Sequence, residues 1–311
     1  MPHKLMRMHR TDVARGRPVM LAIAGDSAAG KTTITSGLVR ALGAERCTAV
    51  CVDDYHRYDR QERSGLPFTA LHPDCNYVDI MEQHLQLLAT GHPVLKPVYD
   101  HHVGVLTRPQ YVEPRDFVIV EGLLPLHTKL AAACFDVTVY LNPPEEVRRE
   151  WKIKRDTAQR GYRREQVLAE LRRREPESEG FIRPQRRRAD IVVRFSAIRD
   201  RHDPPGTPLS AELLLRPTIR HPDLSGILAG SGASMHLKLT RDEDGRPVDA
   251  LHIHGYVPRE ESRMLEKAIW ADLGEGTELP GFLGELEGGQ RSEALAITQL
   301  LLLYHLIEAA R

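Results

Sequence analysis

The chain has 311 residues, of which 41% are hydrophobic, enough for one large α/β domain or two smaller ones. Lysine plus arginine equals aspartate plus glutamate at 43 each, which argues against a dedicated nucleic-acid-binding protein. With no run of 18 apolar residues, only four cysteines and no apolar signal-peptide core, the sequence predicts a cytoplasmic protein without a membrane span.

Five apolar runs predict the buried strands of a mostly parallel sheet, at residues 19–24, 47–52, 117–122, 136–142 and 189–196. Helical patterns lie between several of these runs. Buried strands that alternate with helices are typical of an α/β fold whose sheet is covered by helices on both faces. We assign residues 1–18 to a flexible N-terminus and residues 19–200 to this core.

The sequence GDSAAGKTT follows the first strand and precedes a helical pattern that stops at Gly43. It fits the phosphate-binding pattern G-x-x-x-x-G-K-[ST] and predicts a P-loop NTPase type of core. Backbone N–H groups of such a loop turn toward phosphate oxygens at a helix N-terminus. We expect Lys31 to reach the β- and γ-phosphates of ATP, and Thr32 to hold Mg²⁺. The predicted nucleotide-binding residues are Gly25, Asp26, Ser27, Ala28, Ala29, Gly30, Lys31, Thr32 and Thr33.

Acidic side chains follow two of the other predicted strands, at the sheet edge where ligands of parallel sheets bind. Glu121 ends the third strand and is a candidate metal ligand. Asp53 and Asp54 follow the second strand, and either carboxylate can take the proton of an acceptor hydroxyl. His56 and Arg60 come next and suit an anionic acceptor, because arginine pairs with phosphate oxygens. A charged turn with local ion pairs is the alternative interpretation.

A charged helix is predicted next, with Asn142 as N-cap, Pro143 near its first position and an end at Gly161. An acid flanked by bases on one face of this helix would hold them as a phosphate clamp, although ordinary surface pairing is the alternative. The residues on or beside this face, spaced at i, i+4 and i+8 with one neighbour, are Lys152, Asp156, Arg160 and Arg155.

Basic residues outnumber acidic ones between residues 148 and 188, with fifteen lysines and arginines against seven aspartates and glutamates. We interpret the part near residues 160–188 as a lid that closes over the nucleotide phosphates. An RNA-binding face is the alternative, but no aromatic platform interleaves the arginines.

The composition changes after the core, where the proline-rich residues 199–210 predict a linker or a surface loop. Residues 235–257 predict a β-hairpin with an Asp-Gly turn, and residues 260–273 and 293–310 predict helices. The last helix is apolar over more than one face, so it is buried in the core or against a partner. We assign residues 201–311 to a β/α extension packed on the core.

Six stretches of the sequence resemble phosphoribulokinases, which use ATP and Mg²⁺ to phosphorylate ribulose 5-phosphate at C1 in the Calvin cycle. They stand in the family's order and span nearly the whole chain: GDSAAGKTT, CVDDYHRYDR, KPVYDHHVG, VIVEGLLPL, WKIKRDTAQRG and SEALAITQLLLLYHLIEA. The first four also suit the related uridine kinases, whereas the last two do not.

The resemblance implies roles for individual residues and a homodimer. It makes Asp53 the catalytic base, and it makes Lys31, Lys152 and Asp156 further catalytic residues. The residues implied to bind the sugar phosphate are His56, Arg60, Tyr99, His101, Arg155 and Arg160, and those implied to bind the metal are Thr32 and Glu121.

The residues alone leave two other functions open, a uridine-kinase-like nucleoside kinase and a nucleotide-dependent regulatory or RNA-binding protein. The resemblance also bears on redox control, because photosynthetic phosphoribulokinases carry one regulatory cysteine where Ala29 stands and a second at the position of Cys51. In an extended strand Cys47 and Cys51 would lie about 13 Å apart, too far for a disulfide. The sequence does not place Cys75 and Cys134, so a different disulfide stays open. With only one cysteine of the family's pair present, we expect an enzyme without a dithiol switch.

Overall fold

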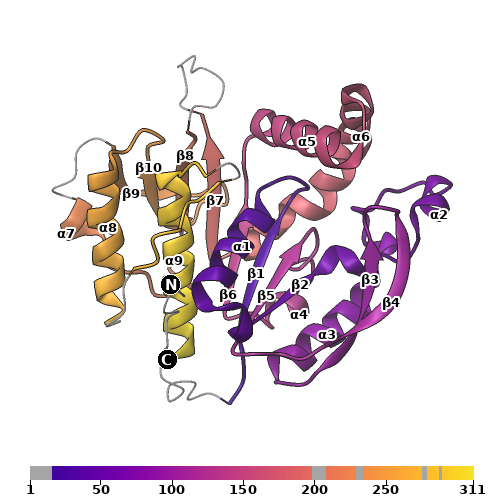
Figure 1. Ribbon diagram of the computed structural model, residues 1–311, viewed down its shortest axis with the longest axis horizontal. Coiled ribbons are helices and arrows are strands. Elements are labelled where there is room, and N and C mark those ends of the chain that lie inside the picture. Colours follow the sequence, from indigo (N-terminus) through magenta and orange to yellow (C-terminus); the bar gives the residue numbers. More distant parts are fainter. Residues whose placement is uncertain (1–15, 198–207, 229–233, 275–278, 287–288) are drawn as a thin grey trace.

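Eight strands in the described part of the chain form one mixed sheet, in the order β2-β5-β1-β6-β7-β8-β10-β9 (Figure 1). The computed structural model describes residues 16–197, 208–228, 234–274, 279–286 and 289–311. The eight strands of the sheet are β1 (Val19–Gly25), β2 (Cys47–Cys51), β5 (Phe117–Gly122), β6 (Val137–Leu141), β7 (Ile191–Ser196), β8 (Ser210–Leu215), β9 (Met235–Arg241) and β10 (Pro247–Ile253).

The strands β2, β5, β1, β6 and β7 run parallel, which confirms the five predicted strands and the α/β class. Every residue of β1 is buried, because the side chains on both faces of the strand contact helices. Leu21 and Ile23 pack with α1 (Lys31–Leu42) and α9 (Glu293–Ala310), whereas Met20 packs with α3 (Val78–Ala89) and α4 (Lys129–Ala132). The phosphate loop between β1 and α1 therefore stands on a sheet that is fixed from both sides.

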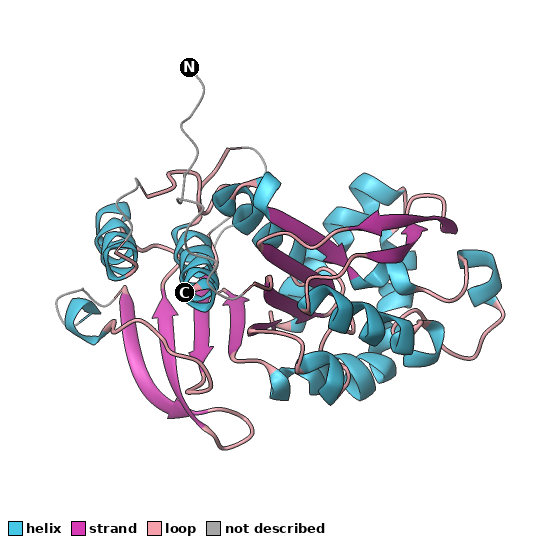
Figure 2. Cartoon of the chain, turned by 90° about the horizontal axis from the view of Figure 1, so that it is seen from below, coloured by secondary structure: helices cyan, strands magenta, loops and turns pink. Residues whose placement is uncertain are grey.

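The C-terminal residues extend this sheet with antiparallel strands, because β7 pairs with β8, β8 with β10 and β10 with β9. The predicted hairpin and both predicted helices are confirmed, as β9, β10, α8 (Arg259–Asp272) and α9. Figure 2 shows α8 and α9 on one face of these strands. The short helix α7 (Ser225–Leu228) lies beside β9 and α8.

Helix α9 is buried along nearly its whole length inside its own fold. It packs against α1, α8, β1 and β8. Of the two explanations that the sequence left open for its apolar surface, burial in the core is therefore the one that the structure shows. By length and composition it is the one helix among the described residues that meets the criteria for a membrane span, but 83% of that stretch is buried in the fold. This is the pattern of a core helix.

A second hairpin, which the sequence did not predict, stands apart from the main sheet. Its strands β3 (Val94–Asp100) and β4 (Val105–Val112) pair antiparallel, and α2 (Arg60–Ser64) lies at its tip (Figure 1). Strand β8 was also not predicted. The hairpin matters for function because it carries two of the predicted substrate-binding residues.

The charged helix begins later than predicted. It is α5 (Glu145–Arg160), with Pro144 at the N-cap, so the prediction that Asn142 caps it was wrong. The N–H of Asn142 instead donates to Val193 O of β7, which keeps this backbone extended. The predicted end is confirmed, because Gly161 closes the helix with φ of 70°. Helix α6 (Arg164–Glu177) follows immediately.

Two sequence predictions fall mostly outside the described residues. They are the flexible N-terminus, of which residues 1–15 are not described, and the linker at residues 199–210. Within the described part of the N-terminus, the Arg17 guanidinium pairs with both carboxylate oxygens of Asp136, at 2.5 and 2.9 Å. The proposed division of the chain near residue 200 stays a prediction.

Candidate active site

The predicted phosphate loop connects the end of β1 to the first turn of α1. Gly30 stands at the N-cap of α1 with φ of 95°, and Lys31 begins the helix. The Lys31 ammonium is buried and donates to the carbonyl oxygens of Gly25 and Asp26, both at 2.9 Å. The cation is therefore held inside the loop, where phosphate oxygens can replace these two carbonyls.

Thr32 and Glu121 meet beside this loop because β5 pairs with β1. The Thr32 hydroxyl lies 3.2 and 3.4 Å from the two carboxylate oxygens of Glu121. Burial raises the pKa of Glu121, and the Lys31 charge opposes that shift. Hydroxyl and carboxylate oxygens suit Mg²⁺, which proteins bind with one or two carboxylates plus substrate phosphates. Among the described residues, no group of three or more His, Cys, Asp or Glu side chains is arranged to hold a metal ion by itself. Thr32 and Glu121 remain the candidate metal ligands because their oxygen atoms meet beside the phosphate loop.

The two aspartates after β2 lie in different surroundings. Asp54 forms an ion pair with the buried Lys96, and its second oxygen accepts the N–H of Tyr99 at 3.1 Å. Among the described residues, the Asp53 carboxylate instead accepts the backbone N–H of Leu123 at 2.9 Å and forms no ion pair. Asp53 is thus oriented but not neutralised, as a general base requires.

Glycine at position 122 lets Asp53 approach the end of β5. A Cβ on Gly122 would lie 2.8 Å from the Asp53 carboxylate and 2.3 Å from the side chain of Val52. Its φ of 150° also favours glycine. The Glu121-Gly122 pair therefore places the candidate metal ligand and the candidate base side by side.

Aromatic and basic side chains gather near Asp53. His56 is buried, and its Nδ1 lies 2.7 Å from Asn76 Oδ1. The His56 ring is 4.8 Å from the ring of Tyr99 and 5.9 Å from that of His101. Burial lowers the pKa of His56 to about 4, so its ring is neutral at pH 7. The structure thus brings these three predicted substrate-binding residues together.

Arg60 lies at the edge of this group and holds the tip of the β3–β4 hairpin. The Arg60 guanidinium donates to the carbonyl of His101 at 2.7 Å, and the backbone N–H of Arg60 donates to Gly104 O at 2.8 Å. The neighbouring Arg63, which the sequence analysis did not select, donates to the Tyr99 hydroxyl at 2.7 Å. Two arginines of α2 therefore face the candidate acceptor site.

The predicted charged face of α5 is present and turns toward the phosphate loop. Lys152 and Asp156 are both buried and pair at 2.7 Å, while Arg155 and Arg160 approach the same carboxylate at 2.9 and 3.6 Å. Arg155 also reaches the Ser27 hydroxyl at 3.2 Å. Burial lowers the pKa of Lys152 to about 8, and the Arg174 charge acts in the same direction. This cluster joins the phosphate loop to the predicted lid.

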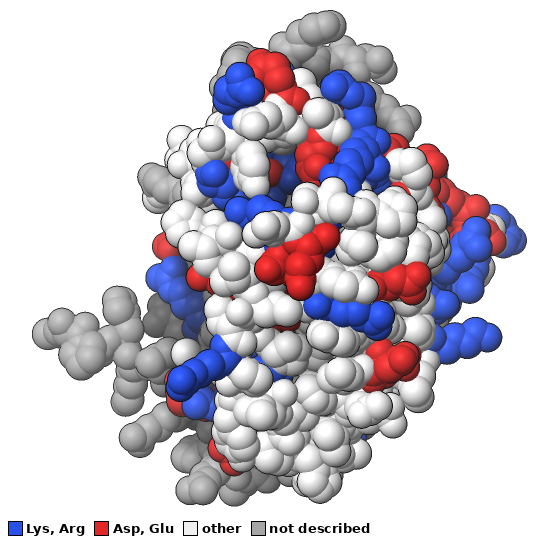
Figure 3. All heavy atoms as spheres, turned by 90° about the vertical axis from the view of Figure 1, so that its right-hand side faces the viewer, with Lys and Arg blue, Asp and Glu red and all other residues white. Residues whose placement is uncertain are grey.

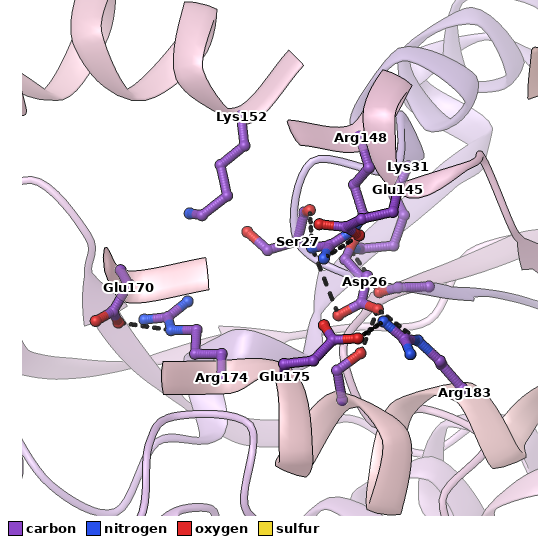
Figure 4. A network of polar contacts seen from close by, with 12 residues as sticks. Asp26, Ser27, Lys31, Glu145, Arg148, Lys152, Glu170, Arg174, Glu175 and Arg183 are labelled. Carbon is purple, nitrogen blue, oxygen red and sulfur yellow. Dashed lines mark hydrogen bonds and ion pairs between the residues drawn. The ribbon is translucent and has the colours of Figure 1, made fainter. Parts of the chain in front are cut away.

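A second polar network surrounds Asp26 of the phosphate loop (Figure 4). Arg148 of α5 and Arg183, which follows α6, point toward its carboxylate, each at 3.9 Å. On the other side of the loop, Lys152 extends from α5 toward Ser27, and Arg174 of α6 pairs with Glu170 at 2.6 Å. Cations from two helices thus surround the place where phosphates would lie.

A family model described as the phosphoribulokinase / uridine kinase family matches residues 20–200. The chain belongs to this family. The resemblance seen in the sequence motifs is thereby confirmed at the level of the family.

Individual relatives include phosphoribulokinases and uridine kinases. A phosphoribulokinase of Synechocystis sp. is 40% identical over 183 residues, which cover 59% of this chain and 55% of that protein. The chloroplastic phosphoribulokinase of Triticum aestivum is 31% identical over 204 residues, 60% of this chain and 50% of that protein. A uridine kinase of Oceanobacillus iheyensis is 30% identical over 189 residues, 58% and 88% of the two chains. The family member described here thus spans about half the length of these phosphoribulokinases.

A solved phosphoribulokinase from Rhodobacter spheroides has the same fold. It superposes with a TM-score of 0.58 at 18% identity and covers 83% of this chain and 96% of that one. This structural match covers more of the chain than the family model does, so the similarity in fold includes part of the C-terminal extension.

Several side chains in this kinase-family site escaped the sequence analysis. The hairpin itself had a detectable signal, because Gly104 separates two strand-like segments. No local signal marked the tertiary partners, which come from distant parts of the chain: Arg63, Asn76, Lys96, Leu123, Arg148 and Arg174.

Proposed function

We propose that this chain transfers the γ-phosphoryl group of ATP to the C1 hydroxyl of ribulose 5-phosphate, forming ribulose 1,5-bisphosphate. The observation that carries the proposal is the contrast between two adjacent carboxylates. Asp54 is paired with Lys96. In the described part of the chain, Asp53 instead has one oxygen without a hydrogen bond or ion pair, and it lies near Gly122 and His56. The Synechocystis and Triticum relatives, which are phosphoribulokinases by name, support the choice of acceptor.

The chain's own residues divide the work of the reaction. Asp53 accepts the C1 hydroxyl proton while the N–H of Leu123 fixes its other oxygen. Lys31, Lys152 and Arg155 supply positive charge to the phosphoryl group as it moves. Mg²⁺, when bound at the Thr32 hydroxyl and the Glu121 carboxylate, would neutralise charge on the β- and γ-phosphates.

The acceptor is held on the side of the β3–β4 hairpin. Burial lowers the pKa of His101, and the charges of Arg160 and Arg63 act on its ring in the same direction. Two arginines directed at one site favour a substrate that carries a phosphate, because guanidinium groups bind phosphate oxygens bidentately. The neutral ring of His56 would contact sugar hydroxyls rather than add charge.

The assembly and location of the enzyme are further parts of the proposal. We propose a cytoplasmic homodimer that binds no nucleic acid. The homodimer rests on the family resemblance alone, because α9 is buried in its own fold and does not need a partner copy. On the face shown in Figure 3, basic and acidic side chains are interspersed, which supports small-molecule rather than RNA binding on that face.

A uridine-kinase-like nucleoside kinase is the second candidate. The observation in its favour is coverage, since the match spans 88% of the uridine kinase of Oceanobacillus iheyensis. Such an enzyme would bind an uncharged acceptor and would not need the arginines beside Tyr99.

ADP release, measured with ribulose 5-phosphate, ribose 5-phosphate and uridine offered singly, separates the candidates. We expect turnover with ribulose 5-phosphate and background release with the other two. Preferential turnover with uridine would support the nucleoside kinase, and slow hydrolysis indifferent to every acceptor would indicate a non-kinase protein. Lys31→Met serves as the control, because it should abolish release with each acceptor.

A further inference from the structure

The segment that ends the predicted lid contacts both halves of the proposed site. Helix α6 has Pro176 in its last turn and is followed by a π-helical turn, Ser178–Ile182, and a 3-10 turn, Arg183–Arg188. Proline removes a helix hydrogen bond, and π-helical turns often occur at functional sites. Glu177 and Ser178 lie at this junction and point to different loops.

Ser178 contacts the nucleotide side. Its side chain is 1% exposed, and its hydroxyl donates to Asp26 Oδ2 at 2.5 Å. The other oxygen, Oδ1, is buried and has no hydrogen-bond partner among the described residues; the Arg148 guanidinium lies 3.9 Å away. A buried carboxylate with one oxygen unsatisfied depends strongly on its remaining bond. Ser178 is therefore the main short contact that fixes this side chain of the phosphate loop.

Glu177 contacts the acceptor side. One carboxylate oxygen accepts the N–H of Thr69 at 2.7 Å, and the other accepts the hydroxyl of the same residue. The loop that follows, residues 69–76, is closed by Asn76, whose Nδ2 donates to Ala70 O at 3.1 Å. The other amide atom of Asn76 holds His56 at 2.7 Å. Short contacts thus link Glu177 to the histidine of the proposed acceptor site.

We propose that Glu177 and Ser178 are positioning residues that couple nucleotide binding to the order of residues 69–76. The Lys31 ammonium donates to the backbone carbonyl of Asp26, so its transfer to phosphate oxygens changes the bonding of this loop residue. Ser178 holds the side chain of the same residue. Glu177, whose carboxylate fixes Thr69, directly precedes Ser178 in the chain. The acceptor loop orders when the nucleotide is bound, and by linkage the acceptor tightens nucleotide binding equally.

Hydrogen exchange tests the coupling without an acceptor. Magnesium with the non-hydrolysable analogue AMP-PNP should slow amide exchange of residues 69–76 in the wild type by roughly fivefold or more, the usual size of allosteric coupling. Ser178→Ala and Glu177→Ala should lose this protection, while the phosphate loop stays protected. Glu177→Gln should restore it, because the amide oxygen still accepts the Thr69 N–H. The exposed Glu165→Gln on the same helix is the control and should behave as the wild type.

The coupling would be overturned if AMP-PNP did not slow the amide exchange of residues 69–76 in the wild type. It would also be overturned if both alanine variants kept the protection of the wild type. Should Ser178→Ala not fold, Glu177→Ala and Thr69→Val test the same link. Because the residues' role rests on the proposed function, the affinity for AMP-PNP is also compared with and without ribulose 5-phosphate. Wild-type protein that shows the exchange effect but neither binds nor phosphorylates ribulose 5-phosphate would contradict the proposed function and leave the coupling intact.

Discussion

Asp53 and Asp54 are neighbours in sequence whose surroundings give them different tasks. Asp53→Asn should lower kcat by roughly 10²–10⁴-fold, the usual contribution of a positioned base, with nucleotide affinity nearly unchanged. Asp54→Asn should instead lower the free energy of unfolding by about 3 kcal/mol, because it leaves the buried Lys96 ammonium without its partner. Steady-state kinetics and urea unfolding of both variants check this. A crippled but stable Asp54→Asn beside an active Asp53→Asn would reverse the assignment.

The cysteines give a second prediction for single residues. Cys47 and Cys51 lie four positions apart in the one strand β2, and burial raises the pKa of both thiols, that of Cys47 to about 12. Protonated thiols are poor nucleophiles. Activity should therefore survive mild oxidation, with no gain from a dithiol reductant, in the wild type and in Cys51→Ser. A reversible loss that disappears in Cys51→Ser would mean that this thiol takes part in a switch.

At the scale of elements, Arg60 connects α2 to the β3–β4 hairpin. Arg60→Ala should raise the KM for ribulose 5-phosphate by roughly tenfold or more, since charge-assisted hydrogen bonds are worth about 1.5–3 kcal/mol. The KM for ATP should not change, and the exposed Arg108→Ala on β4 is the matched control.

A second variant displaces the Arg60 guanidinium without removing it. A Cβ on Gly104, whose φ is 85°, would lie 2.6 Å from Arg60 Nε. Gly104→Ala should therefore also raise the KM for ribulose 5-phosphate, because the added Cβ pushes this guanidinium out of place. An unchanged KM for ribulose 5-phosphate in both variants would remove Arg60 from the acceptor site.

The parts of this molecule that were predictable are those whose physical cause is local. The central parallel strands β1, β5 and β6 are buried on both faces, so each of them reads as an apolar run. Strand β4 is exposed along most of its length and lacks that signal. The start of α5 was misplaced because Pro144, like Pro143, suits a first turn in sequence, whereas the sheet holds Asn142 extended. The division of labour between Arg60 and Arg63 depends on a hairpin formed 40 residues later, which no local pattern encodes.

At the scale of the whole molecule, a buried histidine pair makes stability depend on acid pH. His305 of α9 lies 3.2 Å from His221, and burial lowers the pKa of His305 to about 3. The folded pKa is below the unfolded value, so the unfolded chain binds the proton first. The contribution of neutral His305 to the free energy of unfolding is therefore complete above about pH 6.5 and is lost as the pH falls from there toward 3.

Urea unfolding at pH 7.5 and pH 5 checks this prediction. His305 should cost the folded state on the order of 2 kcal/mol between these values. His305→Gln should therefore lose correspondingly less stability than the wild type, whereas the exposed His92→Gln should lose as much. Equal losses in the wild type and His305→Gln would show that the pair does not set the acid sensitivity.

The central place of α9 also has a consequence for how the chain is made. Gln299 of this helix donates to the carbonyl of Thr33 in the first turn of α1 and accepts the N–H of Gly284. During synthesis, β1 and α1 leave the ribosome early, but the face of the sheet that they share with α9 stays uncovered until residues 293–310 have emerged. We therefore expect chaperones to cover this face of the nascent kinase core until α9 is available. The phosphate loop would gain the support of Gln299 only after α9 has been made, because this residue lies 266 positions beyond Thr33.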